Sequence, residues 1–188
     1  ITIDQIVDQA VKNNMPSVAL TDNLNMFGLV KFFIKAEKKG IKPISGSSIN
    51  VIFEDDDFAH ELLCLAKNNN GHKNLMKILS QSHNNIHFPS PIITFEELCL
   101  LKNDIKVISG GKSSHIFDLL KRGKVEDTKT KLETFQSAFG EDFVIEVQKT
   151  NRADELDYIS HVLPIASEKG IPVIATNDVI FSNKEDYD

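Results

Sequence analysis

The 188-residue sequence has no tryptophan and only two cysteines. Cys64 and Cys99 are too few for a disulfide framework or a four-thiolate zinc site, so we expect a reducing compartment, the cytoplasm. No apolar run approaches the roughly 20 residues that a membrane-spanning helix needs. We therefore expect no membrane contact.

Several enzyme motifs are also absent. The chain has no glycine-rich phosphate loop, no Cys-x-x-Cys pair, no His-Glu-x-x-His helix and no Gly-x-Ser-x-Gly elbow. Its 21 basic and 27 acidic residues give a net charge of −6, which argues against holding nucleic acid through the overall field of the domain. The 41% hydrophobic and 26% charged content is that of a folded globular chain.

Helices alternate with short apolar strands along the sequence. The hydrophobic spacing predicts helices over 3–12, 26–39, 73–82, 94–101, 114–121, 125–139 and 153–169. It predicts strands over 17–20, 49–53, 62–66, 105–109, 143–147 and 171–175. The strands 49–53 and 62–66 form a hairpin across a solvated acidic turn, Glu54–Asp57, and 83–91 is a long surface loop. This alternation predicts an α/β fold, either a (β/α) barrel or an open doubly wound sheet.

Three carboxylates directly follow or interrupt apolar strands: Asp22, Glu146 and Asp178. Burying a carboxylate there is costly unless it is paired, hydrogen-bonded or metal-bound. The alternative is structural, because an acidic residue at a strand end often caps the next helix, and Glu146 could pair with Lys149. The six histidines show no ligand spacing, so we expect surface or capping side chains: His60, His72, His83, His87, His115 and His161.

Six blocks of residues occur in one order: Val18–Asp22, Asn25–Phe32, Gly40–Gly46, Leu65–Leu75, Ile108–Gly111 and Gly170–Val179. In this order the sequence resembles the N-terminal PHP (polymerase and histidinol phosphatase) domain of bacterial DNA polymerase III alpha subunits. The resemblance implies a distorted seven-stranded (β/α) barrel of PHP type, with the first strand missing from this chain. Because the chain begins at Ile1 rather than Met, we expect residues 1–188 to be a single PHP domain fragment of a larger replicative polymerase subunit.

In that family a cluster of histidines and carboxylates binds up to three metals. The resemblance places the family's ligand positions at Asp22, Asn23, Ser48, Glu61, Gly111, Glu146, Thr150, Asp178 and Ile180. Most of these positions hold neutral side chains that cannot supply the thiolate, imidazole and carboxylate donors of a tight divalent site. We therefore predict a vestigial site with no metal, no catalytic residue and no cofactor of its own.

The resemblance also implies partners. The domain is expected to brace the polymerase core of the same chain and to dock the proofreading exonuclease subunit, while the parent polymerase uses Mg²⁺ and contacts DNA. One alternative is an active phosphoesterase or 3′–5′ exonuclease with a single metal on Asp22, Glu146, Asp178 and either His60 or His115. A second alternative is an unrelated barrel hydrolase, which would make the order of the six blocks a coincidence.

Overall fold

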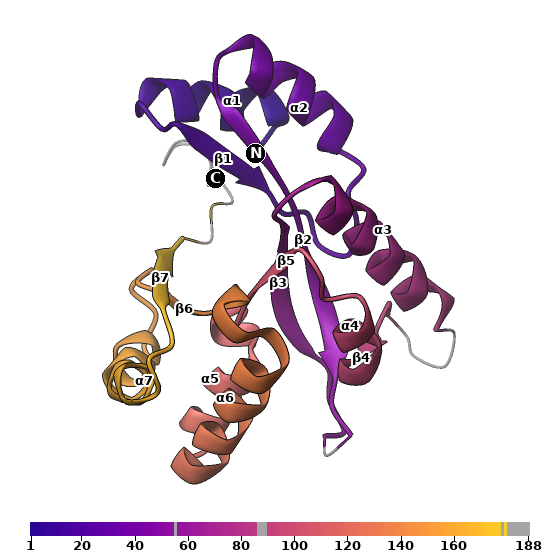
Figure 1. Cartoon of the computed structure of the whole chain (residues 1–188). Coiled ribbons are helices and arrows are strands. Elements are labelled where there is room, and N and C mark those ends of the chain that lie inside the picture. Colours follow the sequence, from indigo (N-terminus) through magenta and orange to yellow (C-terminus); the bar gives the residue numbers. More distant parts are fainter. Residues whose placement is uncertain (55, 86–89, 178, 180–188) are drawn as a thin grey trace.

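A computed structural model of the chain describes residues 1–54, 56–85, 90–177 and 179 (Figure 1). The helices are α1 (Ile3–Lys12), α2 (Leu29–Lys38), α3 (Asn69–Asn84), α4 (Phe95–Leu100), α5 (His115–Lys121), α6 (Val125–Phe139) and α7 (Glu155–Lys169), with 3-10 turns η1 (Gly111–Ser113) and η2 (Gly140–Asp142). The strands are β1 (Ser17–Leu20), β2 (Lys42–Ile52), β3 (His60–Ala66), β4 (Ile93–Thr94), β5 (Ile105–Ile108), β6 (Phe143–Gln148) and β7 (Val173–Thr176). Helices and strands alternate as the hydrophobic spacing predicts.

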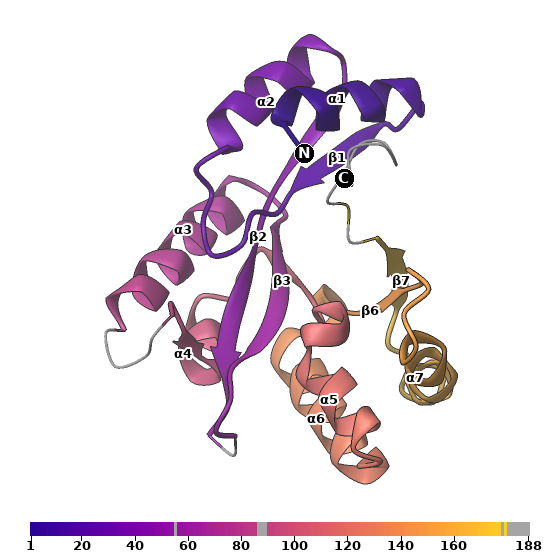
Figure 2. The ribbon, with the colours of Figure 1, turned by 180° about the vertical axis from the view of Figure 1, so that it is seen from behind.

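Within these residues the strands form one mixed seven-stranded sheet in the order β1-β2-β3-β5-β6-β7, with β4 beside β2. Strand β3 is antiparallel to both of its neighbours, β2 and β5, whereas the other pairs run parallel. The sheet curls into a half-barrel with the helices outside it, α1 and α2 beside β1 at one end and α7 beside β6 at the other (Figures 1 and 2). The predicted α/β barrel class and the predicted β2–β3 hairpin are both confirmed.

The two faces of the sheet differ in chemistry because side chains alternate along each strand. On β3, Leu62 and Cys64 belong to the main apolar core beneath the helices, as do Ile49 and Val51 of β2. We call this side the helix face. The residues between them, such as Glu61, point to the opposite side, which we call the inner face.

The core consists of two apolar clusters. The larger lies between the helix face and α3–α7, where Phe135 stacks on Phe143 with ring centroids 4.7 Å apart. The smaller cluster joins α1, β1 and α2 through seven buried residues: Val7, Ala10, Leu20, Leu29, Phe32, Ala36 and Ile41. The smaller cluster holds the β1 end of the half-barrel and the larger cluster holds the rest of the sheet. Burial of these apolar side chains therefore keeps the strands in place.

Strand β2 begins at Lys42, seven residues before its predicted start. Its first half is small and polar and shows no apolar alternation, so the hydrophobic pattern could not reveal it. Close packing explains the small residues there, because a Cβ on Gly46 would lie 2.5 Å from the Leu65 side chain and 2.9 Å from the Cys64 carbonyl oxygen.

Two predicted helix starts were also displaced. Helix α2 begins at Leu29 rather than 26, because the Asn25 side chain accepts a hydrogen bond from the Phe27 backbone N–H (3.0 Å) and forms a turn first. Helix α3 begins before residue 73 because Asn68 caps it, accepting from Asn70 N (2.8 Å) and Gly71 N (3.1 Å).

The segment 83–91, predicted as a surface loop, begins as helix. Helix α3 extends through Asn84, so the first two residues of that segment are helical, and residues 86–89 lie outside the described residues. Among the helices of the described residues, none has the length and apolar content required to cross a bilayer.

Candidate functional site

The predicted ligand positions lie either within the strands of the half-barrel or in the segments that follow them. The described positions are Asp22 and Asn23 after β1, Ser48 in β2, Glu61 in β3, Gly111 after β5, Glu146 in β6 and Thr150 after β6. We call this set the strand-end positions. The remaining two predicted residues, Asp178 and Ile180, lie outside the described residues.

Asn23 and Ser48 are joined by a hydrogen bond between neutral side chains. Ser48 Oγ donates to Asn23 Oδ1 (3.1 Å), and the same two residues form an isolated parallel bridge. The backbone carbonyl of Asp22 accepts from Ser47 Oγ (2.8 Å), and the Asp22 carboxylate lies beside Gly28 at the start of α2. The side chains of Asn23 and Ser48 therefore satisfy each other, and together they tie the loop after β1 to β2.

Glu146 is buried among neutral donors. Its carboxylate accepts hydrogen bonds from Gln148 Nε2 (3.2 Å) and from the Thr176 hydroxyl of β7, and its backbone N–H donates to Ser109 Oγ (2.9 Å). The Tyr158 hydroxyl donates to the Glu146 carbonyl (3.3 Å), and burial raises the pKa of that tyrosine. The described contacts do not include the pairing with Lys149 that the sequence suggested. Through its hydrogen bond from Thr176, the Glu146 carboxylate ties β6 to β7.

The Ser109-Gly110-Gly111 segment after β5 is shaped by close backbone approach. Gly110 has φ +87°, and a Cβ there would lie 2.1 Å from the Glu61 carbonyl oxygen of β3. Gly111 has φ +52°, and a Cβ there would lie 3.1 Å from Gln148 Nε2. The Gln148 amide thus fills the space next to Gly111.

Thr150 holds the loop that leads into α7. Its backbone N–H donates to Glu155 Oε2 (2.6 Å), its hydroxyl donates to Glu155 Oε1, and Arg152 N also donates to Oε2 (3.2 Å). The hydrogen bond from the Thr150 hydroxyl is the main reason why the pKa of Glu155 is lowered; burial opposes it. Thr150 therefore acts as a structural anchor for a carboxylate rather than as an isolated donor.

The acidic strand-end positions are spread across the sheet. The register pairs Leu63 with Ile108 and Ile108 with Val144, so Glu61 and Glu146 stand in one row with β5 between them. Strands are spaced roughly 4.8 Å apart, which separates the backbones of these two residues by about 10 Å. In the described residues no group of three possible ligands forms at these positions.

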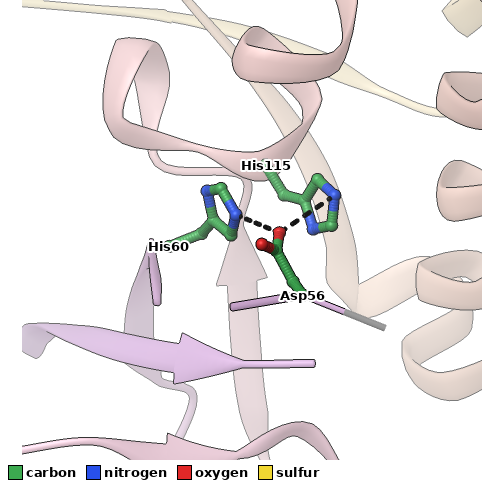
Figure 3. A group of neighbouring side chains, drawn as sticks. All are labelled: Asp56, His60 and His115. Carbon is green, nitrogen blue, oxygen red and sulfur yellow. Dashed lines mark hydrogen bonds and ion pairs between the residues drawn. The ribbon is translucent and has the colours of Figure 1, made fainter. Parts of the chain in front are cut away.

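A different set of side chains does converge. Asp56 lies in the β2–β3 turn, His60 begins β3 and His115 begins α5, and their potential ligand atoms all lie within 4.8 Å of one another. Figure 3 shows both imidazoles directed at the same carboxylate oxygen: Asp56 Oδ2 lies 2.6 Å from His60 Nε2 and 3.6 Å from His115 Nε2. We call these three residues the Asp56 triad.

The surroundings of the Asp56 triad fix its geometry. The two imidazoles stack with centroids 4.3 Å apart, and the Phe53 ring packs against His115 at 5.0 Å. Phe58 N donates to Asp56 Oδ1 (3.1 Å), which leaves Oδ2 for the imidazoles. Burial would raise the pKa of Asp56, but hydrogen bonds from His60 and the Phe58 backbone and the charges of the two histidines lower it overall.

The expectation of surface or capping histidines is therefore wrong for His60 and His115, which are both buried. The expectation of a fully solvated acidic turn is wrong for Asp56, because the fold closes α5 over that turn. The sequence could indicate only the pair Asp56 and His60, which are four residues apart. It could not indicate His115, which is distant in the chain and reaches the pair only through the fold. Of the other histidines, His72 contacts Ser45 Oγ and His83 contacts the Leu24 carbonyl, and His87 lies outside the described residues.

Comparison with known proteins gives a matching family and several relatives. The model of the PHP domain matches residues 1–150. The DNA polymerase III subunit alpha of Vibrio cholerae is 35% identical over 188 residues, which are 99% of this chain and 16% of that protein. The protein of the same name from Escherichia coli is 33% identical over 186 residues, 97% of this chain and 16% of that protein. The chain thus spans about one-sixth of the length of these relatives.

Two solved structures are similar in fold. An amidohydrolase from Chromobacterium violaceum with bound sulfate and no metal has a TM-score of 0.62 and 13% identity, over 99% of this chain and 84% of that one. A structure described as a metal-dependent phosphoesterase from Bifidobacterium adolescentis has a TM-score of 0.58 and 14% identity, over 97% and 83%. At these identities the likeness concerns the fold alone.

Proposed function

Because this chain belongs to the PHP domain family, we propose that it is a structural, catalytically silent PHP domain. The observation that carries the proposal is the hydrogen bonding at the strand-end positions. Ser48 donates to Asn23, and Thr150 donates to Glu155, so side chains at expected ligand positions bond to their neighbours. Neutral side chains that are already hydrogen-bonded to their neighbours are poor ligands for a divalent ion.

We extend the proposal to the parent protein. Residues 1–188 are one domain of a DNA polymerase III alpha subunit, a cytoplasmic enzyme whose other parts carry out DNA-templated DNA synthesis with Mg²⁺. The relatives from Vibrio cholerae and Escherichia coli support this, since each matches nearly the whole of this chain with a small part of its own length.

In the parent, the domain would brace the polymerase core and dock the proofreading exonuclease subunit. Its net charge of −6 supports a role in contacts between proteins, because a domain that grips DNA by itself needs a basic surface. DNA would be reached through other parts of the parent. Direct DNA binding by this chain with a steep salt dependence would contradict this role.

The proposed lack of catalytic activity is tested by incubating the full chain with a 3′-labelled DNA strand and Mn²⁺. We expect no nucleotide release above the buffer blank. The variant Glu146→Gln removes the buried strand-end carboxylate, and Glu126→Gln on the exposed surface of α6 is the matched control. Hydrolysis that survives Glu126→Gln and disappears with Glu146→Gln would establish the alternative, an active phosphoesterase.

Docking is tested separately by mixing the full chain with the purified exonuclease subunit of the same replisome and measuring the molecular mass by sedimentation. We expect a one-to-one complex that persists at moderate salt. Two independently sedimenting species at concentrations well above micromolar would contradict docking by this domain.

A further inference from the structure

We propose that the Asp56 triad binds one divalent first-row transition-metal ion, for which Zn²⁺ is the best match. Asp56, His60 and His115 offer two imidazole nitrogens and one carboxylate oxygen, a donor set that first-row ions bind readily. Asp56 and His60 come from the β2–β3 turn and the start of β3, whereas His115 comes from α5, which is distant in the sequence.

The distances suit the ion. Zinc binds histidine nitrogen at roughly 2.0–2.1 Å and carboxylate oxygen at roughly 2.0–2.2 Å, so two ligands in a tetrahedral shell lie about 3.3 Å apart. The two separations from Asp56 Oδ2, 2.6 Å to His60 and 3.6 Å to His115, lie on either side of that value. Shifts on the order of 1 Å or less would admit the ion.

The donors are oriented before any ion arrives. The Phe58 backbone N–H holds one oxygen of Asp56, so the other faces both imidazoles. The side chains of His60 and His115 are 10% and 7% exposed, and Phe53 packs against the stacked rings. Contacts of this kind, which orient the ligands and exclude water, strengthen metal sites. Asp56 is 18% exposed, which gives the ion an entrance and leaves room for water as a fourth ligand.

The proposed site is separate from the strand-end positions. His60 and Glu61 are consecutive on β3, so their side chains point to opposite faces of the sheet. His60 lies on the helix face with Leu62, and Glu61 lies on the inner face opposite Asn50. Zinc at the Asp56 triad therefore neither requires nor restores a catalytic metal at the strand ends, and the proposed function stands or falls independently.

A bound ion would connect the β2–β3 turn to α5. Because the ion binds only the folded arrangement, it stabilises the fold in proportion to its saturation. At a free Zn²⁺ concentration of 100 times Kd, we expect the melting temperature of a chain of this length to rise by roughly 5–10 °C.

The test uses the full chain, stripped with chelator, and titrated with Zn²⁺ by calorimetry, with metal content measured after gel filtration. We expect one zinc per chain and a loss of affinity of at least about 100-fold in His60→Gln and in His115→Gln, since each removes a ligand. The matched control is His161→Gln, because His161 also faces an aspartate, Asp157, but on the exposed surface of α7. The variant Glu146→Gln should bind zinc unchanged.

Three results overturn the proposal. The first is a folded chain that binds no zinc, and the second is binding that survives both triad substitutions. The third is binding abolished by Glu146→Gln, which would place the metal at the strand ends. If a histidine variant does not fold, nitrogen-15 NMR of the imidazoles in the unsubstituted chain decides. Zinc should then shift the ring nitrogens of His60 and His115 and leave those of His161 unmoved, and any other pattern contradicts the site.

Discussion

Replacing Gly110 by alanine is the sharpest test of how the strand-end region is built. The substitution has two costs, a backbone cost from φ +87° and a steric cost from the Glu61 carbonyl oxygen 2.1 Å from the new Cβ. A non-glycine residue in the left-handed region costs roughly 1–2 kcal/mol. Forcing extra volume into a packed site costs about 1–3 kcal/mol more, so the free energy of unfolding should fall by roughly 2–5 kcal/mol in total.

Gly170→Ala is the matched control, because Gly170 ends α7 with φ +65° and has no atom within 4 Å of the Cβ position. In Gly170→Ala the free energy of unfolding should fall only by the backbone cost, roughly 1–2 kcal/mol. Urea unfolding followed by circular dichroism measures both variants, and an unchanged slope with denaturant shows that the two unfolded states are comparable. Equal losses in the two variants would refute the close approach of β5 to β3 at Gly110.

Three further predictions concern other parts of the molecule. Burial raises the pKa of the Cys64 thiol to about 12 and also raises that of the less buried Cys99, so iodoacetamide at pH 8 should modify Cys99 first and Cys64 only on unfolding, as mass spectrometry can show. The lowered pKa of Glu155 stabilises the fold at pH values above the unfolded-state pKa of about 4.3, and this stabilisation is lost as the pH falls through the folded-state pKa. The melting temperature of Glu155→Gln should therefore depend less on pH in that acid range than the melting temperature of the unsubstituted chain. Parallel curves of melting temperature against pH for the two chains would contradict this. Phe135→Ala removes a ring that is 1% exposed and stacked on Phe143, and should cost about 3–5 kcal/mol. The exposed control Leu100→Ala should stay within about 0.5 kcal/mol, and similar losses in both would contradict the assigned core.

The periodic elements could be predicted from the sequence because their apolar residues face one core. The predicted bounds of α6, 125–139, match the structure, and the hairpin of β2 and β3 was identified from its two apolar runs. The first half of β2 was missed because Ser45, Gly46 and Ser47 are buried by close packing of backbones rather than by hydrophobicity. Small polar residues carry no period that distinguishes such a strand from a loop.

The candidate sites show a similar division. Ser48 lies within β2 and Glu146 lies within β6, two of the positions that the family motifs indicated. The motifs could not show that Ser48 bonds to Asn23 or that Glu146 accepts from Thr176, since these partners are tens of residues away in the chain. The Asp56 triad was missed for the same reason, because the position of His115 depends on how α5 packs.

The alternation along β3 has a consequence for how the chain can change in length. Val51 pairs with His60, so residues 52–59 form the whole connection between the two paired strands. A residue inserted in this connection lengthens it without moving β3, because burial of Leu62 and Cys64 holds the register of that strand. A residue inserted within β3 between His60 and Leu62 would instead exchange the faces of the side chains before it and turn His60 away from His115. The length of β3 is therefore constrained more tightly than the length of the connection that precedes it.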